Sequence, residues 1–142
     1  MTVPLSRPRY DQIHPLHAVL LAGTVPLFLG ALFSDWAYAA SYEIQWKNFA
    51  SWLIPAGLVF AGLALLWTVI DMLRADLRGA RPYTYFLVLL AAWILGFVNA
   101  LVHAQDAWAS MPTALILSIA IAVLAIVATA LGFSTLGSRG IK

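Results

Sequence analysis

The 142 residues of this chain are 63% hydrophobic and only 10% charged, with a mean hydropathy of +0.89. Soluble domains carry about 25% charged residues, so this composition excludes a water-soluble domain. The net charge of +2 comes from basic residues that form no single patch, which argues against nucleic-acid binding, and the absence of cysteine excludes disulfides and thiolate metal sites. The composition therefore predicts one integral membrane domain over residues 1–142.

Four apolar runs follow a polar tail over residues 1–12. They cover residues 15–33, 49–73, 83–102 and 113–133. Each run approaches or exceeds the roughly 20 residues that a helix needs to span a bilayer. Between the runs we expect an aromatic loop over 34–48, a basic loop over 72–82 and a short connection over 103–112. Short connections make successive helices antiparallel, so the predicted fold class is all-α: an integral membrane four-helix antiparallel bundle.

Basic residues are shared unequally between the two ends of this predicted bundle. Lys47 alone falls on the end with the first and third connections, and the other seven fall on the end with both termini. Cytoplasmic loops carry the excess of Lys and Arg, so we expect both termini in the cytoplasm. The seven are Arg7, Arg9, Arg74, Arg78, Arg81, Arg139 and Lys142.

Small residues recur at spacings of three and four within each run. Lipid does not drive helices together, so helices must associate through close packing of such small faces. The pattern therefore predicts a compact bundle. The residues are Gly23 and Gly30; Gly57, Ala61 and Ala64; Ala92, Gly96 and Ala100; and Ser118, Ala122, Ala125, Thr129 and Gly132.

The end of the third run holds three polar side chains at helical spacing. Asn99 and His103 are four residues apart and Asp106 is three further on, so all three share one face while the helix lasts. Polar groups at the edge of hydrocarbon are costly and usually face other helices or water. Two interpretations stay open: an ordinary helix end capped by polar residues, and a polar site on the external face.

A second cluster is expected at the opposite end. His14 and His17 are three apart at the start of the first run, beside the end of the second run at Asp71. Two histidines and a carboxylate are a possible metal site, and they are equally suited to a hydrogen-bonded polar knot between two helices.

Haem and a transport pathway are both disfavoured by position. His103 lies about 20 residues, or roughly 30 Å, along its helix from the face that holds His14 and His17, so no two histidines on different helices share a depth. No charge lies in the middle of a span, where transport sites are found. Nor is there a phosphate-binding glycine loop, a nucleophile elbow or a carboxylate pair, so the chain is not recognisably an enzyme.

Aromatic side chains and one methionine gather in the two connections expected on the external face. Interfacial belts explain some of them, but six large side chains in two short loops exceed what such belts need. Aromatic residues and Met are enriched where proteins meet, so we interpret this surface as a partner-binding site. The residues are Trp36, Tyr38, Tyr42, Trp46, Trp108 and Met111.

Three segments resemble a known family. They are IHPLHAVLLAGTVPLFLGALFSD, WLIPAGLVFAGLALLWTVIDML and HAQDAWASMPTALILSIAIAVLAIVATALGFS, and the similarity runs from about His14 to Gly140. They resemble the uncharacterised bacterial membrane proteins grouped as domain of unknown function 2231, with His14-Pro15-Leu16-His17, Asp35, Gly57, Asp71 and the 103–112 block as the most specific pieces. Members are expected to be four-helix inner-membrane proteins, and some occur beside or fused to periplasmic quinoprotein dehydrogenases and c-type cytochromes.

The resemblance implies an accessory role near respiratory electron transfer, and three hypotheses follow. The first is a non-catalytic anchor or accessory subunit for a periplasmic or membrane redox partner, with no cofactor of its own. The second is a redox-active subunit that binds haem or quinone. The third is a small transporter or channel.

Overall fold

The computed structural model describes residues 13–74 and 80–137, and it consists of helices over almost all of that length. The helices are α1 (Pro15–Ser41), α2 (Ile44–Leu73), α3 (Ala80–His103), the single-turn α4 (Ala107–Ser110) and α5 (Thr113–Gly137). Four of them are long and apolar enough to cross a membrane: α1, α2, α3 from Pro82 and α5 up to Ser134. The predicted all-α membrane bundle is therefore confirmed. The polar tail over residues 1–12 lies outside the described residues.

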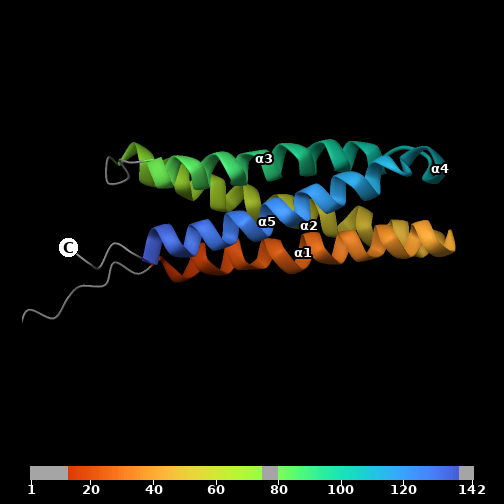
Figure 1. Cartoon of the computed structure of the whole chain (residues 1–142), viewed down its shortest axis with the longest axis horizontal. Coiled ribbons are helices and arrows are strands. Elements are labelled where there is room, and N and C mark those ends of the chain that lie inside the picture. Colours follow the sequence, from red (N-terminus) through yellow and green to blue (C-terminus); the bar gives the residue numbers. More distant parts are fainter. Residues whose placement is uncertain (1–12, 75–79, 138–142) are drawn as a thin grey trace, which may run out of the picture.

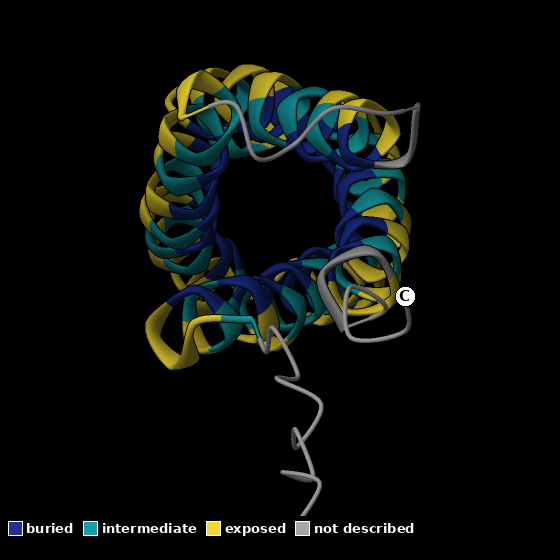
Figure 2. Cartoon of the chain, turned by 90° about the vertical axis from the view of Figure 1, so that its left-hand side faces the viewer, coloured by how far each residue is buried: buried dark blue, intermediate teal, exposed yellow. Residues whose placement is uncertain are grey.

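The four long helices run antiparallel and form a closed ring (Figure 1). Helix α1 packs against α2, α2 against α3, α3 against α5, and α5 back against α1. Figure 2, seen along the bundle, shows the buried residues lining the inside of this ring and the exposed residues on its outside. We call the end where α1 begins and α5 ends the terminal end. The opposite end, with the α1–α2 turn and α4, is the loop end.

The prediction of an aromatic loop over residues 34–48 is wrong. Helix α1 continues to Ser41 and α2 begins at Ile44, so only Tyr42 and Glu43 connect them. Tyr42 ends α1 in a left-handed conformation, with φ of 57°, and its N–H donates to the Tyr38 carbonyl over 2.7 Å. Polar Ser34 and Asp35 suggested a helix end, but both are buried: Ser34 donates to the Gly30 carbonyl of its own helix, and Asp35 bonds to side chains of other helices.

Small residues bring the helices into close contact, as their spacing predicted. A Cβ atom at Gly57 of α2 would lie 2.6 Å from the Phe28 ring of α1, so the ring occupies the place of a side chain. The side chains of Leu21 and Tyr85 occupy the corresponding space beside Gly132 of α5. Buried alanines complete the inner faces of α2, α3 and α5: Ala61, Ala64, Ala92, Ala122, Ala125 and Ala128.

Candidate functional site

Four polar side chains from three helices form a hydrogen-bonded network inside the loop end. His103 Nε2 of α3 lies 2.8 Å from Asp35 Oδ1 of α1. Ser118 Oγ of α5 donates to Asp35 Oδ2 over 2.5 Å, and Asn99 Nδ2 of α3 donates to Ser118 Oγ over 2.8 Å. All four side chains are buried, Asp35 and Asn99 completely. We call these four residues the buried network.

The hydrogen-bond partners of the His103 ring indicate which of its nitrogens carries a hydrogen. His103 Nδ1 lies 2.9 Å from the Asn99 backbone carbonyl oxygen, which only accepts, so Nδ1 carries a hydrogen. The other ring nitrogen, Nε2, faces the Asp35 carboxyl group, so both nitrogens of the imidazole have a hydrogen-bond partner. Such pairing is the condition under which ionisable groups tolerate burial.

Asn99 Oδ1 is the one buried side-chain oxygen or nitrogen in the described part of the chain that lacks a hydrogen-bond partner. The orientation of this amide follows from Ser118, which gives its hydrogen to Asp35 and must accept one from Asn99. An unmade hydrogen bond of a buried group costs about 1–3 kcal/mol. The network therefore contains one acceptor that remains open.

The structure brings together two of the three residues expected at the external face. Asn99 and His103 belong to the buried network, but Asp106 is exposed and precedes α4, to which its side chain makes no capping bond. The helical spacing that joined Asp106 to the other two fails because α3 ends at His103. Sequence reasoning missed Asp35 and Ser118 as partners. The sequence held one indication of the contact: Asp35 and His103 each lie just after a predicted apolar run, and both runs end on the same side of the predicted bundle.

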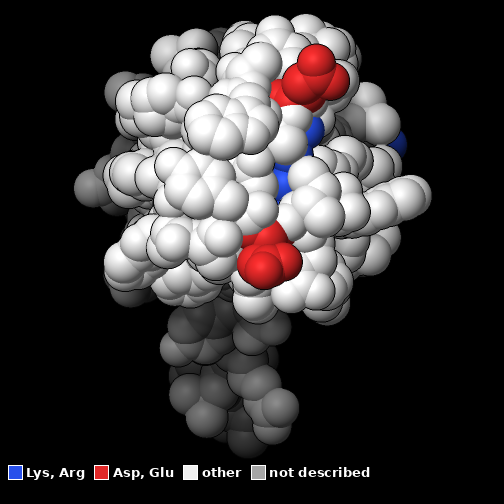
Figure 3. Space-filling model, turned by 90° about the vertical axis from the view of Figure 1, so that its right-hand side faces the viewer, with Lys and Arg blue, Asp and Glu red and all other residues white. Residues whose placement is uncertain are grey.

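Lys47 links the start of α2 to the connection between α3 and α4, also at the loop end. Its side chain is 8% exposed, and Nζ donates to the backbone carbonyl of Gln105 over 2.6 Å, in the connection between α3 and α4. Glu43 and Asp106 are exposed at this end. Figure 3 shows the resulting surface, which is almost uncharged apart from two separate acidic patches and recessed basic atoms between them.

At the terminal end, the two histidines pack around a tryptophan and find different partners. His17 Nε2 lies 2.9 Å from the buried Tyr85 hydroxyl of α3. His14 Nδ1 accepts the Leu16 N–H at the start of α1, and both imidazoles contact the Trp67 ring of α2, with centroids 4.7 and 6.0 Å away. The two histidines of α1 therefore contact α2 through the Trp67 ring.

Asp71 does not complete the expected polar knot. It is half-buried and within electrostatic range of His17, but no hydrogen bond joins it to either histidine. Among the described residues, no three His, Cys, Asp or Glu side chains are placed to hold a metal ion together.

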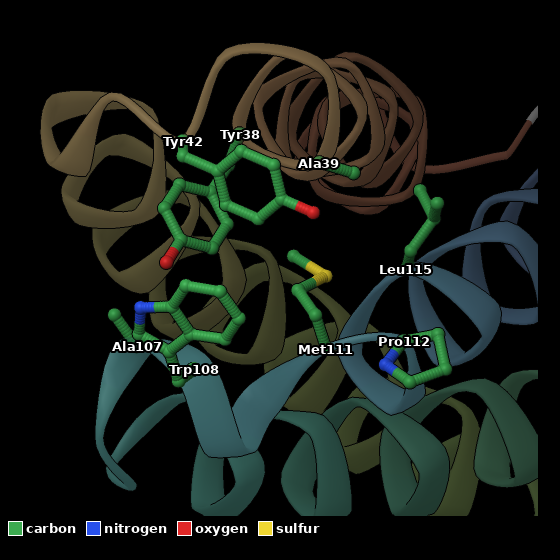
Figure 4. A pocket seen from close by; sticks show the side chains of 8 residues that line it. All are labelled: Tyr38, Ala39, Tyr42, Ala107, Trp108, Met111, Pro112 and Leu115. Atoms are coloured by element: carbon green, nitrogen blue, oxygen red, sulfur yellow. The ribbon is translucent and has the colours of Figure 1, made fainter.

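The residues of the expected partner surface divide into separate groups. Tyr38, Tyr42, Trp108 and Met111 surround a cavity of about 270 Å³ at the loop end (Figure 4). The Tyr42 and Trp108 rings stack with centroids 5.6 Å apart, and Tyr38 meets Tyr42 edge-on at 6.0 Å. We call this cavity the ring pocket; Ala39, Ala107, Pro112 and Leu115 complete its lining.

Trp36 and Trp46 lie outside the ring pocket. Trp36 borders an apolar groove of about 350 Å³ between α1 and α5, which we call the tail groove; its other residues are Leu32, Phe33, Leu115 and Ile119. Trp46 packs against Phe49 on α2, with ring centroids 5.9 Å apart. Tyr38, with 3% of its surface exposed, is part of the core as well as of the pocket wall.

Comparison with known proteins confirms the family expected from the sequence. No curated protein and no solved structure matches the chain. A family model described as a predicted membrane protein, DUF2231, matches residues 13–141, which include all the described helices and the residues of both ends. The chain belongs to the DUF2231 family of predicted membrane proteins.

Proposed function

We propose that this protein is a non-catalytic anchor or accessory subunit of a redox assembly in the bacterial inner membrane, and that its partner docks on the loop end. The observation that carries the proposal is the exposed aromatic pair on this end. Tyr42 and Trp108 stack on each other and yet keep 61% and 79% of their surfaces exposed. Large aromatic side chains in such positions supply most of the binding free energy of protein interfaces.

The surroundings of this pair also suit a docking surface. The segments that carry the two rings are held by hydrogen bonds inside the bundle: the buried network joins α1, α3 and α5, and Lys47 donates to the connection before α4. Apart from its two acidic patches this surface is uncharged (Figure 3), and interface centres are depleted in charge. The redox partner itself is proposed from the family resemblance, and the external location is proposed from the excess of basic residues in the sequence of the two tails and the 72–82 connection.

Trp108 and Trp52 provide a matched test of this surface. Both are exposed, at 79% and 78%, but Trp52 lies on the outer face of α2, away from the ring pocket. A photo-crosslinking residue placed at position 108 in the native host should capture one defined membrane or periplasmic redox protein. The same residue at position 52 should capture none.

The affinity of the captured partner gives the quantitative test. Trp108→Ala should weaken its association about tenfold or more, as expected for a hot-spot residue, whereas Trp52→Ala should leave it unchanged. Equal effects of the two substitutions, or a crosslinked partner that maps to the terminal end, would contradict the proposed docking surface.

A further inference from the structure

The ring pocket and the tail groove meet at a single residue. Leu115 of α5 lines both, and α1 supplies the facing wall of each, with Tyr38 and Tyr42 in the pocket and Leu32 and Trp36 in the groove. From Tyr42 back to Leu32 is ten residues of helix, or about 15 Å. Because Tyr42 ends α1 at the loop end, the groove leads from the pocket toward the middle of the apolar span.

The ring pocket offers flat apolar walls and two hydrogen-bond donors. Tyr42 and Trp108 supply stacked rings, and in Figure 4 the sulfur end of Met111 points between these rings and Leu115. Among the described residues, neither the Tyr38 nor the Tyr42 hydroxyl has a hydrogen-bond partner. A volume of about 270 Å³ is below the roughly 300–1,000 Å³ of sites for drug-sized ligands, so the pocket suits a single ring.

The charges at this end disfavour a phospholipid headgroup. Among the described residues of the loop end, Lys47 is the one Lys or Arg side chain, and it is buried with Nζ bonded to the Gln105 carbonyl. The exposed charges are the carboxylates of Glu43 and Asp106, which repel a phosphate. The site therefore suits a neutral head with hydrogen-bond acceptors and a planar ring, attached to an apolar tail.

We propose that the loop end binds a membrane quinone, with the quinone ring in the ring pocket, its carbonyl oxygens accepting hydrogen bonds from Tyr38 and Tyr42, and its isoprenoid tail in the tail groove. The buried network supports this site from one helical turn below. Asp35 precedes Tyr38 by three residues and Ser118 follows Leu115 by three, so the 2.5 Å bond between Ser118 and Asp35 holds the two walls together. The proposal concerns binding, and it goes beyond the docking role without depending on it.

The test uses the purified full-length protein in detergent and two probes, a benzoquinone with a decyl tail and the same ring without a tail. We expect saturable quenching of tryptophan fluorescence by the decyl quinone and at least about tenfold weaker binding of the bare ring. Tyr38→Phe removes one donor and keeps the ring, so it should weaken binding about tenfold. Leu115→Trp, which blocks the junction, should abolish binding, and Leu101→Trp on the exposed face of α3 should leave it unchanged.

Three results would overturn the proposal. One is quenching that never saturates or that is equal in all variants, which indicates partition into the micelle. Another is displacement of the quinone by phosphatidylglycerol or phosphatidylethanolamine vesicles at equal lipid concentration, which would make the groove a phospholipid site. The third uses only the unmodified protein: a photoreactive azidoquinone should label residues of the ring pocket, and labelling confined to other segments would exclude the site. Since no partner is present, these results are independent of the docking proposal.

Discussion

Asp35 lies inside an apolar helix and is completely buried, yet each of its two carboxyl oxygens is hydrogen-bonded to a side chain of another helix. A carboxyl group buried in this position needs those partners, because an unpaired buried polar group is costly. His103 and Ser118 come from α3 and α5, so one side chain links three of the four spans. Asp106, with the same chemistry, is exposed and has no such partners in the described structure.

These two aspartates predict opposite outcomes of the same substitution. Asp35→Ala leaves His103 Nε2 and the Ser118 hydroxyl hydrogen without a partner in the interior, so it should lower the free energy of unfolding by about 3 kcal/mol, the low end for a broken buried pair. Asp106→Ala should change it by less than about 0.5 kcal/mol. Reversible unfolding in mixed micelles, followed by circular dichroism, measures both. Similar losses for the two variants would mean that the buried network does not stabilise the fold.

At the scale of the helices, glycine determines how closely neighbours approach. Gly57 of α2 faces the ring of Phe28, which is buried in the hydrophobic core. Gly30 of α1 faces only the tip of Leu53, at 3.1 Å from an added Cβ atom, and Leu53 is half-buried. Both glycines lie within helices, where alanine is intrinsically favoured by about 1 kcal/mol.

The pair Gly57 and Gly30 therefore separates packing from helix propensity. Gly57→Ala overpacks the contact between α1 and α2 and should destabilise the protein by about 1–3 kcal/mol. Gly30→Ala should be neutral or stabilising by up to about 1 kcal/mol, because Leu53 is able to shift. Thermal unfolding of the two variants in the same detergent compares them directly. A stabilising Gly57→Ala would show that the Phe28 contact is loose.

For the whole molecule, four spans place both termini on the same side of the membrane. Which side this is depends on the basic residues, of which Arg7, Arg9, Arg78, Arg139 and Lys142 lie outside the described residues. By sequence, seven of the eight Lys and Arg residues belong to the two tails and the 72–82 connection, which predicts that the terminal end is cytoplasmic and that the ring pocket opens on the periplasmic face.

Reporter fusions after Lys142 test this orientation. A green fluorescent protein fused there should fluoresce, because it folds in the cytoplasm, and alkaline phosphatase fused at the same point should be inactive. As a control, alkaline phosphatase inserted between Tyr42 and Glu43, at the loop end, should be active. The reverse pattern would place the docking surface and the proposed quinone site in the cytoplasm.

Much of this architecture follows from the sequence alone. Four apolar runs of about 20 residues or more must form four spanning helices, because backbone groups in hydrocarbon have no partners outside their own helix. The small residues that recur at helical spacing identify the inner faces, since lipid provides no other reason for helices to pack closely. Of the three polar residues expected on one face, Asn99 and His103 are both buried in the bundle and Asp106 is exposed.

The tertiary structure alone decided which polar residues meet. Asp35 is 68 residues from His103 and 83 from Ser118, so no local spacing reveals their contacts. These partners satisfy Asp35 inside the bundle, so α1 continues past this residue, where the sequence predicted a helix end. The longer helix places Tyr38 and Tyr42 beside α4. The walls of the ring pocket also come from segments that are far apart in the sequence, and only the packing of the helices brings them together.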